Sequence, residues 1–278
     1  MIKLMSIFAA AASLAAASLA HPASANAGPV LDKVLATKTL KVAIGTDWGK
    51  LSFLNDKHEL DGFGVEVSKG IAQRLGAQVQ FVTPSWDVIA AGKWEGRWDM
   101  TIQMTPTNAR AEKFDFPVEY FWAPTVAVVH KDSKATTLSD LDGKVVGVAA
   151  NTDSAFYVSH KLTPDWKGAK PIQYQFTPGE VKTYESTNVA FDDLRLGNGV
   201  RLDAVVTDKT IALNAIEAGY PLKLLGGNLY SSPGAVAIEP GDKEFSSKIA
   251  AAIKDMNDDG TLSKLSIKWY GVDYTVDQ

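Results

Sequence analysis

Residues Asp99–Tyr120 read DMTIQMTPTNARAEKFDFPVEY, and this stretch joins a strand, an arginine-bearing turn and an aromatic run. Met100 and Ile102 alternate with polar residues, which predicts a short strand. Thr105-Pro106-Thr107 then leads into a short helical turn that holds Arg110. The sequence therefore presents Arg110 on the connection that follows a strand.

The chemistry of this connection favours an anionic guest. Thr105 and Thr107 offer hydroxyls, Thr107 is suited to cap the turn, and the first N–H groups of the turn are free. Arg110 adds a planar fork that matches a carboxylate. We therefore expect a small carboxylated molecule at this place. The alternative is a weak surface ion pair of Arg110 with Glu112 or Asp115.

The N-terminus has the pattern of a secretory signal peptide over residues 1–27. Lys3 precedes an Ala- and Leu-rich apolar run at residues 7–20, and Ala25-Asn26-Ala27 has the form of a cleavage site. The run is short for a bilayer span and is interrupted by Ser, so a permanent anchor is the weaker interpretation. We expect cleavage near Ala27 and a soluble protein in a bacterial periplasm.

The composition excludes several kinds of site. The chain has no Cys, so disulfides, thiolate nucleophiles and a lipidated N-terminal Cys are excluded. Its four His residues, at positions 21, 58, 130 and 160, show no ligand spacing, and we expect no metal and no cofactor. Losing the signal peptide removes one Lys and no acid, so the formal charge changes from −4 to −5. Nucleic acid is therefore a poor partner.

Hydrophobic periodicity predicts two α/β units in the remaining chain. Residues 39–81 show a strand, a helix and a strand, which indicates a parallel βαβ unit. A second α/β pattern follows at residues 138–216, and apolar crossings lie at residues 118–130 and 235–238. Two units joined by two crossings describe a hinged, bilobal protein that encloses its ligand. We expect these segments: 28–123 and 234–278 in lobe 1, and 124–233 in lobe 2.

Several short motifs occur in an order that is typical of one family. They are Gly45-Thr46-Asp47, the sequence DGFGVEV at 61–67, Trp86-Asp87, the pattern T-x-x-x-x-R followed by D-F at 105–116, DAVVTD at 203–208, and the closing segment at 260–271. With these motifs the chain resembles the extracellular solute-binding proteins of ABC transporters, in particular the polar amino-acid-binding family, bacterial extracellular solute-binding protein family 3. The resemblance covers nearly the whole mature chain and implies a type II periplasmic-binding-protein fold.

The resemblance also implies a site for an amino-acid head group. Arg110 would take the α-carboxylate with Thr105 beside it. Asp208, from the other lobe, and the carbonyl of Gln103 would accept from the α-ammonium. Ligand binding by groups on both lobes would then shift the equilibrium toward closure.

Trp48 and Trp86 would pack on the ligand's side chain or stem. Other interpretations stay open for these and neighbouring residues. The two Trp residues could equally be ordinary aromatic residues of a hydrophobic core. Asp208 is placed to cap the helix that follows it. Asp47 either touches the ligand or orients its loop.

The chain departs from the family pattern at three places, and one of them is the strand into the signature, residues 99–105, which is one residue shorter than the usual form. The first-strand loop at 47–53 lacks the usual paired prolines, and the anion-binding corner G-T-T of the second lobe is replaced by Asn151-Thr152-Asp153. Thr152 and Asp153 are nevertheless expected to contact the ligand. An acid at position 153 would disfavour a second carboxylate and suit a cationic side chain, unless it points outward as a helix cap.

Two classes of function fit these residues. The first is a non-enzymatic, monomeric receptor that delivers an amino acid or related carboxylated solute to an inner-membrane permease. The second is an enzyme on the same scaffold, because cyclohexadienyl and arogenate dehydratases resemble this family. Such an enzyme needs a general acid, for which Asp153 and Glu185 are the candidates. No spacing in the sequence singles out either acid.

Overall fold

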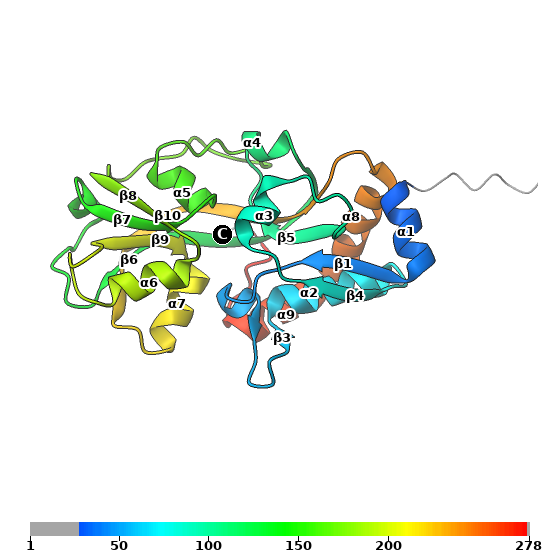
Figure 1. The fold of residues 1–278 in the computed structure, drawn as a ribbon, viewed down its shortest axis with the longest axis horizontal. Coiled ribbons are helices and arrows are strands. Elements are labelled where there is room, and N and C mark those ends of the chain that lie inside the picture. The colour runs from blue at the N-terminus through cyan, green and yellow to red at the C-terminus, as the bar shows by residue number, and fades with distance from the viewer. Residues whose placement is uncertain (1–27, 277–278) are drawn as a thin grey trace, which may run out of the picture.

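The structure, a computed structural model, describes residues 28–276 and has two α/β lobes side by side along its long axis (Figure 1). The predicted bilobal α/β fold is confirmed. The signal peptide predicted at residues 1–27 lies outside the described residues. Within residues 28–276, no helix combines the length and the hydropathy that a membrane crossing requires.

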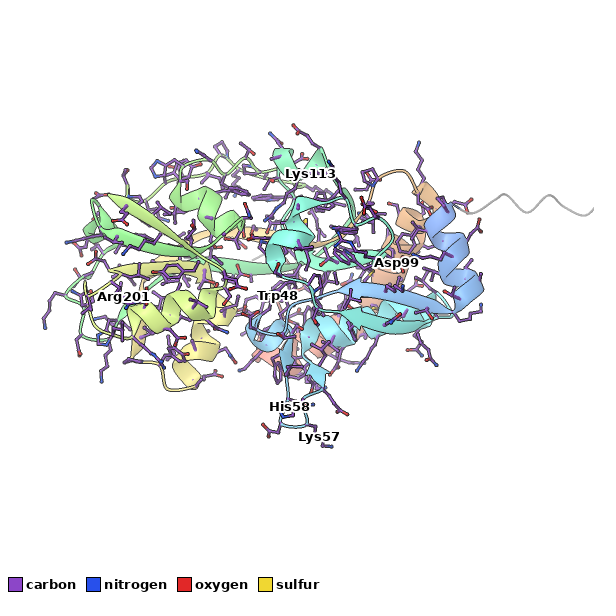
Figure 2. All side chains as sticks on the ribbon, in the orientation of Figure 1. Trp48, Lys57, His58, Asp99, Lys113 and Arg201 are labelled. Carbon is purple, nitrogen blue, oxygen red and sulfur yellow. The ribbon has the colours of Figure 1, made fainter. Side chains whose placement is uncertain are left out.

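The first lobe contains the parallel strands β4, β1 and β5, in this order, with helices around them. The small hairpin β2–β3 projects from it, and Lys57 and His58 lie at the tip of the hairpin (Figure 2). The elements are α1 (Pro29–Thr37), β1 (Thr39–Ala43), η1 (Gly49–Leu51), β2 (Phe53–Leu54), β3 (Leu60–Asp61), α2 (Phe63–Arg74), β4 (Gln78–Val82), α3 (Trp86–Ala91), β5 (Met100–Met104), α4 (Asn108–Ala111), α8 (Lys243–Asp258) and α9 (Thr261–Tyr270).

The second lobe contains the strands β9, β7 and β8, which pair in parallel in this order. Its elements are η2 (Leu138–Leu141), β7 (Val145–Ala149), α5 (Asp153–Val158), β8 (Glu180–Tyr184), α6 (Thr187–Leu194), β9 (Ala204–Asp208) and α7 (Lys209–Glu217). Short strand-to-helix connections, such as the one from β9 directly into α7, bring the carboxyl ends of these strands to one edge. That edge faces the first lobe.

Two long antiparallel strands, β6 (Asp115–His130) and β10 (Leu222–Ile238), run through both lobes. They connect the two sets of parallel strands into one eight-stranded sheet, in the order β4-β1-β5-β10-β6-β9-β7-β8. The ladder between β6 and β10 is interrupted between Leu225 and Tyr230 and again near Gly234. The lobes thus share two continuous strands, and the lobe boundaries predicted at 123/124 and 233/234 fall on these strands.

Each lobe has its own hydrophobic core. In the first lobe Phe63, Val67 and Ile71 recur every four residues along α2, which places them on one buried face against α8 and the sheet. In the second lobe the strands β7 and β9 are buried between helices on both faces. Burial on both faces explains why Val146 and Val205 belong to nearly continuous apolar runs.

The sequence pattern did not predict α1 or β8, and it predicted only the last residues of β10. The segment Leu222–Ile238 contains two adjacent Gly, two adjacent Ser and a Pro, which break the alternation typical of a strand. It is nevertheless a strand because β6 pairs with it on both sides of the interruption between Leu225 and Tyr230. Tertiary pairing overrides local propensity here.

Candidate functional site

A cavity of about 520 Å³ lies between the lobes, with walls from both. Every residue predicted to contact a ligand lines this cavity. In the first lobe these are Asp47, Trp48, Trp86, Gln103, Thr105 and Arg110, and in the second lobe Thr152, Asp153 and Asp208. Figure 2 shows Trp48 on the part of the first lobe that faces the second. The structure brings the predicted residues together; their roles as ligand contacts stay a prediction.

Arg110 is the buried cation of the cavity. Thr107 caps the short helix α4 by accepting a hydrogen bond from the Arg110 amide, at 3.3 Å, as the sequence predicts. Arg110 is only 5% exposed, and its Nη1 donates to the Thr105 carbonyl, at 2.7 Å. It makes no ion pair with a described residue, so the alternative pairing with Glu112 or Asp115 is wrong.

The second hydrogen bond of Arg110 crosses the cleft. Nη2 donates to the Asn151 carbonyl of the second lobe, at 2.8 Å. Nε1 of Trp86 donates to the same carbonyl, at 3.2 Å, and Nδ2 of Asn151 donates to Oδ1 of Asp87, at 2.8 Å. Asn151 adopts the left-handed conformation, with φ of 57°, which turns its carbonyl toward the first lobe. These bonds hold the lobes together beside the cavity.

The guanidinium of Arg110 also lies between two rings. Its Cζ is 5.4 Å from the centroid of Trp86 and 5.7 Å from that of Phe156, on the helix that begins at Asp153. Burial lowers the pKa of Arg110, and the negative charge of Asp153 opposes that shift. Both hydrogen-bond acceptors of Arg110 are neutral carbonyls, so its charge is not directly paired by any carboxylate of residues 28–276.

Two tryptophans form an aromatic wall. Trp48 and Trp86 meet edge to face, with centroids 5.8 Å apart. Trp48 also packs against both core clusters of the first lobe, so the core interpretation of this residue is partly correct. Gly45 is required beneath it, because a Cβ at Gly45 would lie 2.2 Å from Nε1 of Trp48.

Asp153 faces the cavity and does not cap a helix. Thr152 is the N-cap of α5: its hydroxyl accepts from the Ala155 amide, at 3.1 Å. Oδ2 of Asp153 instead accepts from the hydroxyls of Tyr230 and Ser232, both at 3.0 Å. The outward-pointing alternative for Asp153 is therefore wrong.

Asp208 lies at the end of β9, immediately before α7, yet its side chain makes no capping hydrogen bond. Burial and then the nearby charge of Asp153 raise the pKa of Asp208 to about 8. Gln103 lies opposite in the first lobe with φ of 59°, and its buried Oε1 has no hydrogen-bond partner among the described residues. Because Oε1 of Gln103 is buried beside Gly234 of β10, the carboxylate of Asp208 is the side-chain acceptor that these two residues leave in the cavity wall.

The remaining acids sit nearer solvent. Asp47 is half-buried, and its carbonyl accepts from Nδ2 of Asn188, at 3.4 Å, across the lobes. Glu185 is an exposed residue at the rim. Including Asp153 and Asp208, acids in the cavity wall outnumber its single Arg. Within residues 28–276 no group of His, Asp or Glu side chains is arranged to hold a metal ion.

A loop of the second lobe, residues 163–167, also reaches the first lobe. The Asn108 amide donates to the Thr163 carbonyl, at 3.2 Å, and the Asp165 amide donates to the Pro106 carbonyl, at 3.3 Å. The Lys167 amide donates to Oε1 of Glu119, at 3.2 Å. The connection that carries Arg110 is therefore held by both lobes.

Sequence reasoning missed three features of the site. Tyr230 and Ser232 escaped because their strand was not recognised. The role of the Asn151 carbonyl was not predicted because every residue type has a backbone carbonyl. The only available signal for Tyr230 and Ser232 was the hydroxyl-rich segment 230–232. Two residues separate this segment from the crossing predicted at 235–238.

Comparisons with known proteins agree with this architecture. The profile of the bacterial extracellular solute-binding proteins, family 3, matches residues 40–272. The L-cystine-binding protein TcyJ of Escherichia coli K12 is 30% identical over 250 residues, which cover 88% of each chain. An ancestral arginine-binding protein bound to arginine superposes with a TM-score of 0.72 at 32% identity, over 84% of this chain and 99% of that one.

A further solved structure bears on the enzymatic alternative. The ancestral amino acid-binding protein AncCDT-1, a precursor of cyclohexadienyl dehydratase, has a TM-score of 0.71 and 28% identity, over 86% of this chain and 98% of its own. It is itself described as a binding protein, as are TcyJ and the ancestral arginine-binding protein. The profile match over most of the chain decides the assignment: this chain belongs to family 3 of the bacterial extracellular solute-binding proteins.

Proposed function

We propose that this chain is the substrate-binding receptor of an ABC importer and binds an amino acid in the cavity between its lobes. The observation that carries the proposal is the buried guanidinium of Arg110, whose charge no carboxylate of residues 28–276 pairs directly. A buried, incompletely compensated cation is costly unless the ligand supplies an anion. An α-carboxylate meets that need.

The head group of the ligand would be bound from both lobes. Arg110 and the Thr105 region take the carboxylate in the first lobe, with Thr152 on the opposite wall. Asp208 accepts from the α-ammonium, and the carbonyl of Gln103, which also lines the cavity, adds an acceptor from the facing lobe. Because a zwitterion carries both charges on adjacent atoms, one molecule satisfies both lobes only when they are closed. Binding therefore favours closure.

The rest of the ligand would lie against the aromatic wall. Trp48 and Trp86 supply apolar area with little loss of side-chain entropy, and Asp47 lies at the edge of this wall. The names of similar proteins support this ligand class: TcyJ is a cystine-binding protein, and a probable amino-acid ABC transporter-binding protein of Haemophilus influenzae is 27% identical over 264 residues. Export to the periplasm, a monomeric state and delivery to an inner-membrane permease complete the proposal.

Thermal unfolding tests the proposal directly. The purified protein, stripped of any carried-over ligand by unfolding and refolding, is heated with each common amino acid, opine, betaine and small carboxylate in turn. A ligand at a thousand times its Kd should add about 4 kcal/mol to the free energy of unfolding, which is a large shift in Tm. No shift with any amino acid would overturn the proposal.

The same experiment addresses the dehydratase alternative. The compound that shifts the Tm is recovered and its mass is measured. An unchanged mass agrees with a receptor, whereas a dehydrated product would show an enzyme. The surroundings of the two candidate acids do not favour a general acid. Asp153 accepts two hydrogen bonds from hydroxyl groups, and Glu185 is exposed.

A further inference from the structure

Asp153 occupies an unusual position for an acid. It is the first residue of α5, where a small hydroxyl residue would leave the helix N-terminus open to an anion, and Thr152 already fills the capping role. Asp153 lies in the cavity wall and is only 9% exposed. The side chain therefore changes the charge of the cavity itself.

The surroundings of Asp153 leave one of its oxygens without a partner. Oδ2 accepts from Tyr230 and Ser232, which fix the orientation of the carboxylate. Oδ1 accepts no hydrogen bond from any residue between 28 and 276. An ionised carboxylate has room for several donors, and a buried one is costly without them. A donor from the ligand would complete its coordination.

The charges of the cavity point to the nature of that donor. Arg110 matches one ligand carboxylate and Asp208 matches one ammonium. Asp153 is then a second buried acid, and the one cation of residues 28–276 near it, Arg110, is already assigned to the ligand carboxylate. With a neutral amino acid bound, Arg110 would be shared between Asp153 and the ligand carboxylate, and one negative charge would stay unbalanced; an acidic side chain would place like charges together. A cationic side chain would balance it.

We propose that Asp153, held by Tyr230 and Ser232, binds a cationic side-chain group of the ligand, so that the receptor selects amino acids bearing a second amine or a guanidinium. This inference rests on the proposed function and names its ligand class. The aromatic wall is suited to the same ligands, because an alkyl stem packs on Trp48 and a cation is attracted to the face of an indole.

Isothermal titration calorimetry on the stripped protein tests the proposal. The panel contains arginine, lysine and ornithine, the neutral glutamine and cystine, and acidic glutamate. Agmatine and putrescine serve as cations without a carboxylate. We expect at least one cationic amino acid to bind at least tenfold tighter than glutamine, cystine and glutamate. Tighter binding of any of these three than of every cationic amino acid would overturn the inference and leave the proposed function standing.

Variants assign the selectivity to Asp153. Asp153→Asn keeps the shape and the hydroxyl contacts but removes the charge, and Asp153→Thr gives a hydroxyl in place of the acid. Each should weaken the best cationic amino acid at least tenfold while changing glutamine less than threefold. Asp132→Asn, an exposed acid of the second lobe, is the matched control and should change neither. Equal losses for cationic and neutral ligands would overturn the assignment to Asp153.

The amines separate the two proposals. If agmatine binds as tightly as arginine, the carboxylate site at Arg110 is wrong, while the cation site at Asp153 is supported. If no compound of the panel binds, the inference about Asp153 fails, and the thermal screen of all common amino acids decides the proposed function. Should Asp153→Asn not fold, as judged by its thermal unfolding, Asp153→Thr and the wild-type panel still decide the question.

Discussion

Nη2 of Arg110, in the first lobe, donates a 2.8 Å hydrogen bond to the backbone carbonyl of Asn151, in the second. The guanidinium proposed to bind the ligand carboxylate is thus also a direct link between the lobes. The position of the guanidinium depends on closure of the lobes, and its hydrogen bond to Asn151 in turn helps to stabilise the closed arrangement. Removing Arg110 should therefore weaken both the carboxylate contact and the closed arrangement.

Arg110→Ala should reduce ligand affinity by about 2–5 kcal/mol, the usual cost of leaving a buried charge without its partner. Arg110→Lys keeps the charge but loses the planar fork, so we expect an intermediate loss. Calorimetry with the best ligand of the panel measures both. Arg195→Ala, an exposed arginine of the second lobe, is the control and should bind normally. Affinity of Arg110→Ala within threefold of the parent would show that the carboxylate lies elsewhere.

The hydrogen bond between the side chains of Asn151 and Asp87 should affect ligand binding only by stabilising the closed arrangement of the lobes. Asp87→Ala and Asn151→Gly each remove this 2.8 Å bond, and Gly tolerates the left-handed backbone at position 151. Because the bond is exposed, we expect each variant to lose only about 0.5–1 kcal/mol of binding free energy. A double-mutant cycle measured by calorimetry tests the coupling. If the losses of the two single variants simply add in the double variant, the bond contributes nothing to binding.

Local patterns predicted the parts of the site that depend on local structure. Thr107 caps the turn of Arg110, and β9 ends at Asp208, because both features are set by residues within one turn or strand. The alternation of strands and helices likewise predicted two α/β lobes. The predicted ligand contacts line one cavity because strand ends of parallel sheets meet at one edge.

Features that depend on tertiary pairing were not predictable in this way. The strand β10 contains breakers that only the pairing with β6 overcomes, so the positions of Tyr230 and Ser232 were hidden. The orientation of Asp153 followed from the same strand. Without Tyr230 and Ser232, the sequence alone could not distinguish a helix cap from an acid facing the ligand.

Asp242 should be important for folding but not for binding. Its Oδ2 accepts from the amides of Val30 and Leu31 at the start of α1, at 2.9 and 3.0 Å, and its Oδ1 accepts from the Phe245 amide of α8, at 2.9 Å. One buried carboxylate thus caps two helices. Asp242→Ala should lower the free energy of unfolding by about 2–4 kcal/mol.

Chemical denaturation measures this loss, and calorimetry should show unchanged ligand affinity in conditions where the variant is folded. Asp258→Ala, which removes an exposed acid from the same helix α8, is the control and should cost less than about 1 kcal/mol. A loss below about 1 kcal/mol for Asp242→Ala would contradict the double-capping role.

Ligand binding should depend on pH through Asp208. Its pKa is raised from an ordinary value of 3.8 to about 8, by burial and by the charge of Asp153. In the ligand-free protein Asp208 is therefore mostly protonated at neutral pH, and an ammonium must displace that proton to pair with the carboxylate. Affinity should rise about tenfold per pH unit up to about pH 8 and then level off, because one proton is released.

The same shift gives the ligand-free protein the opposite pH dependence. Between about pH 4 and 8 the folded state binds a proton that the unfolded state has lost, so this contribution to stability is full below about pH 4 and is lost as the pH rises to about 8. Calorimetry in two buffers of different ionisation enthalpy measures the proton release, and Asp208→Asn should abolish it. Affinity that stays constant from about pH 6 to 8, or a slope that survives in Asp208→Asn, would show that Asp208 is not the group that pairs with the ammonium.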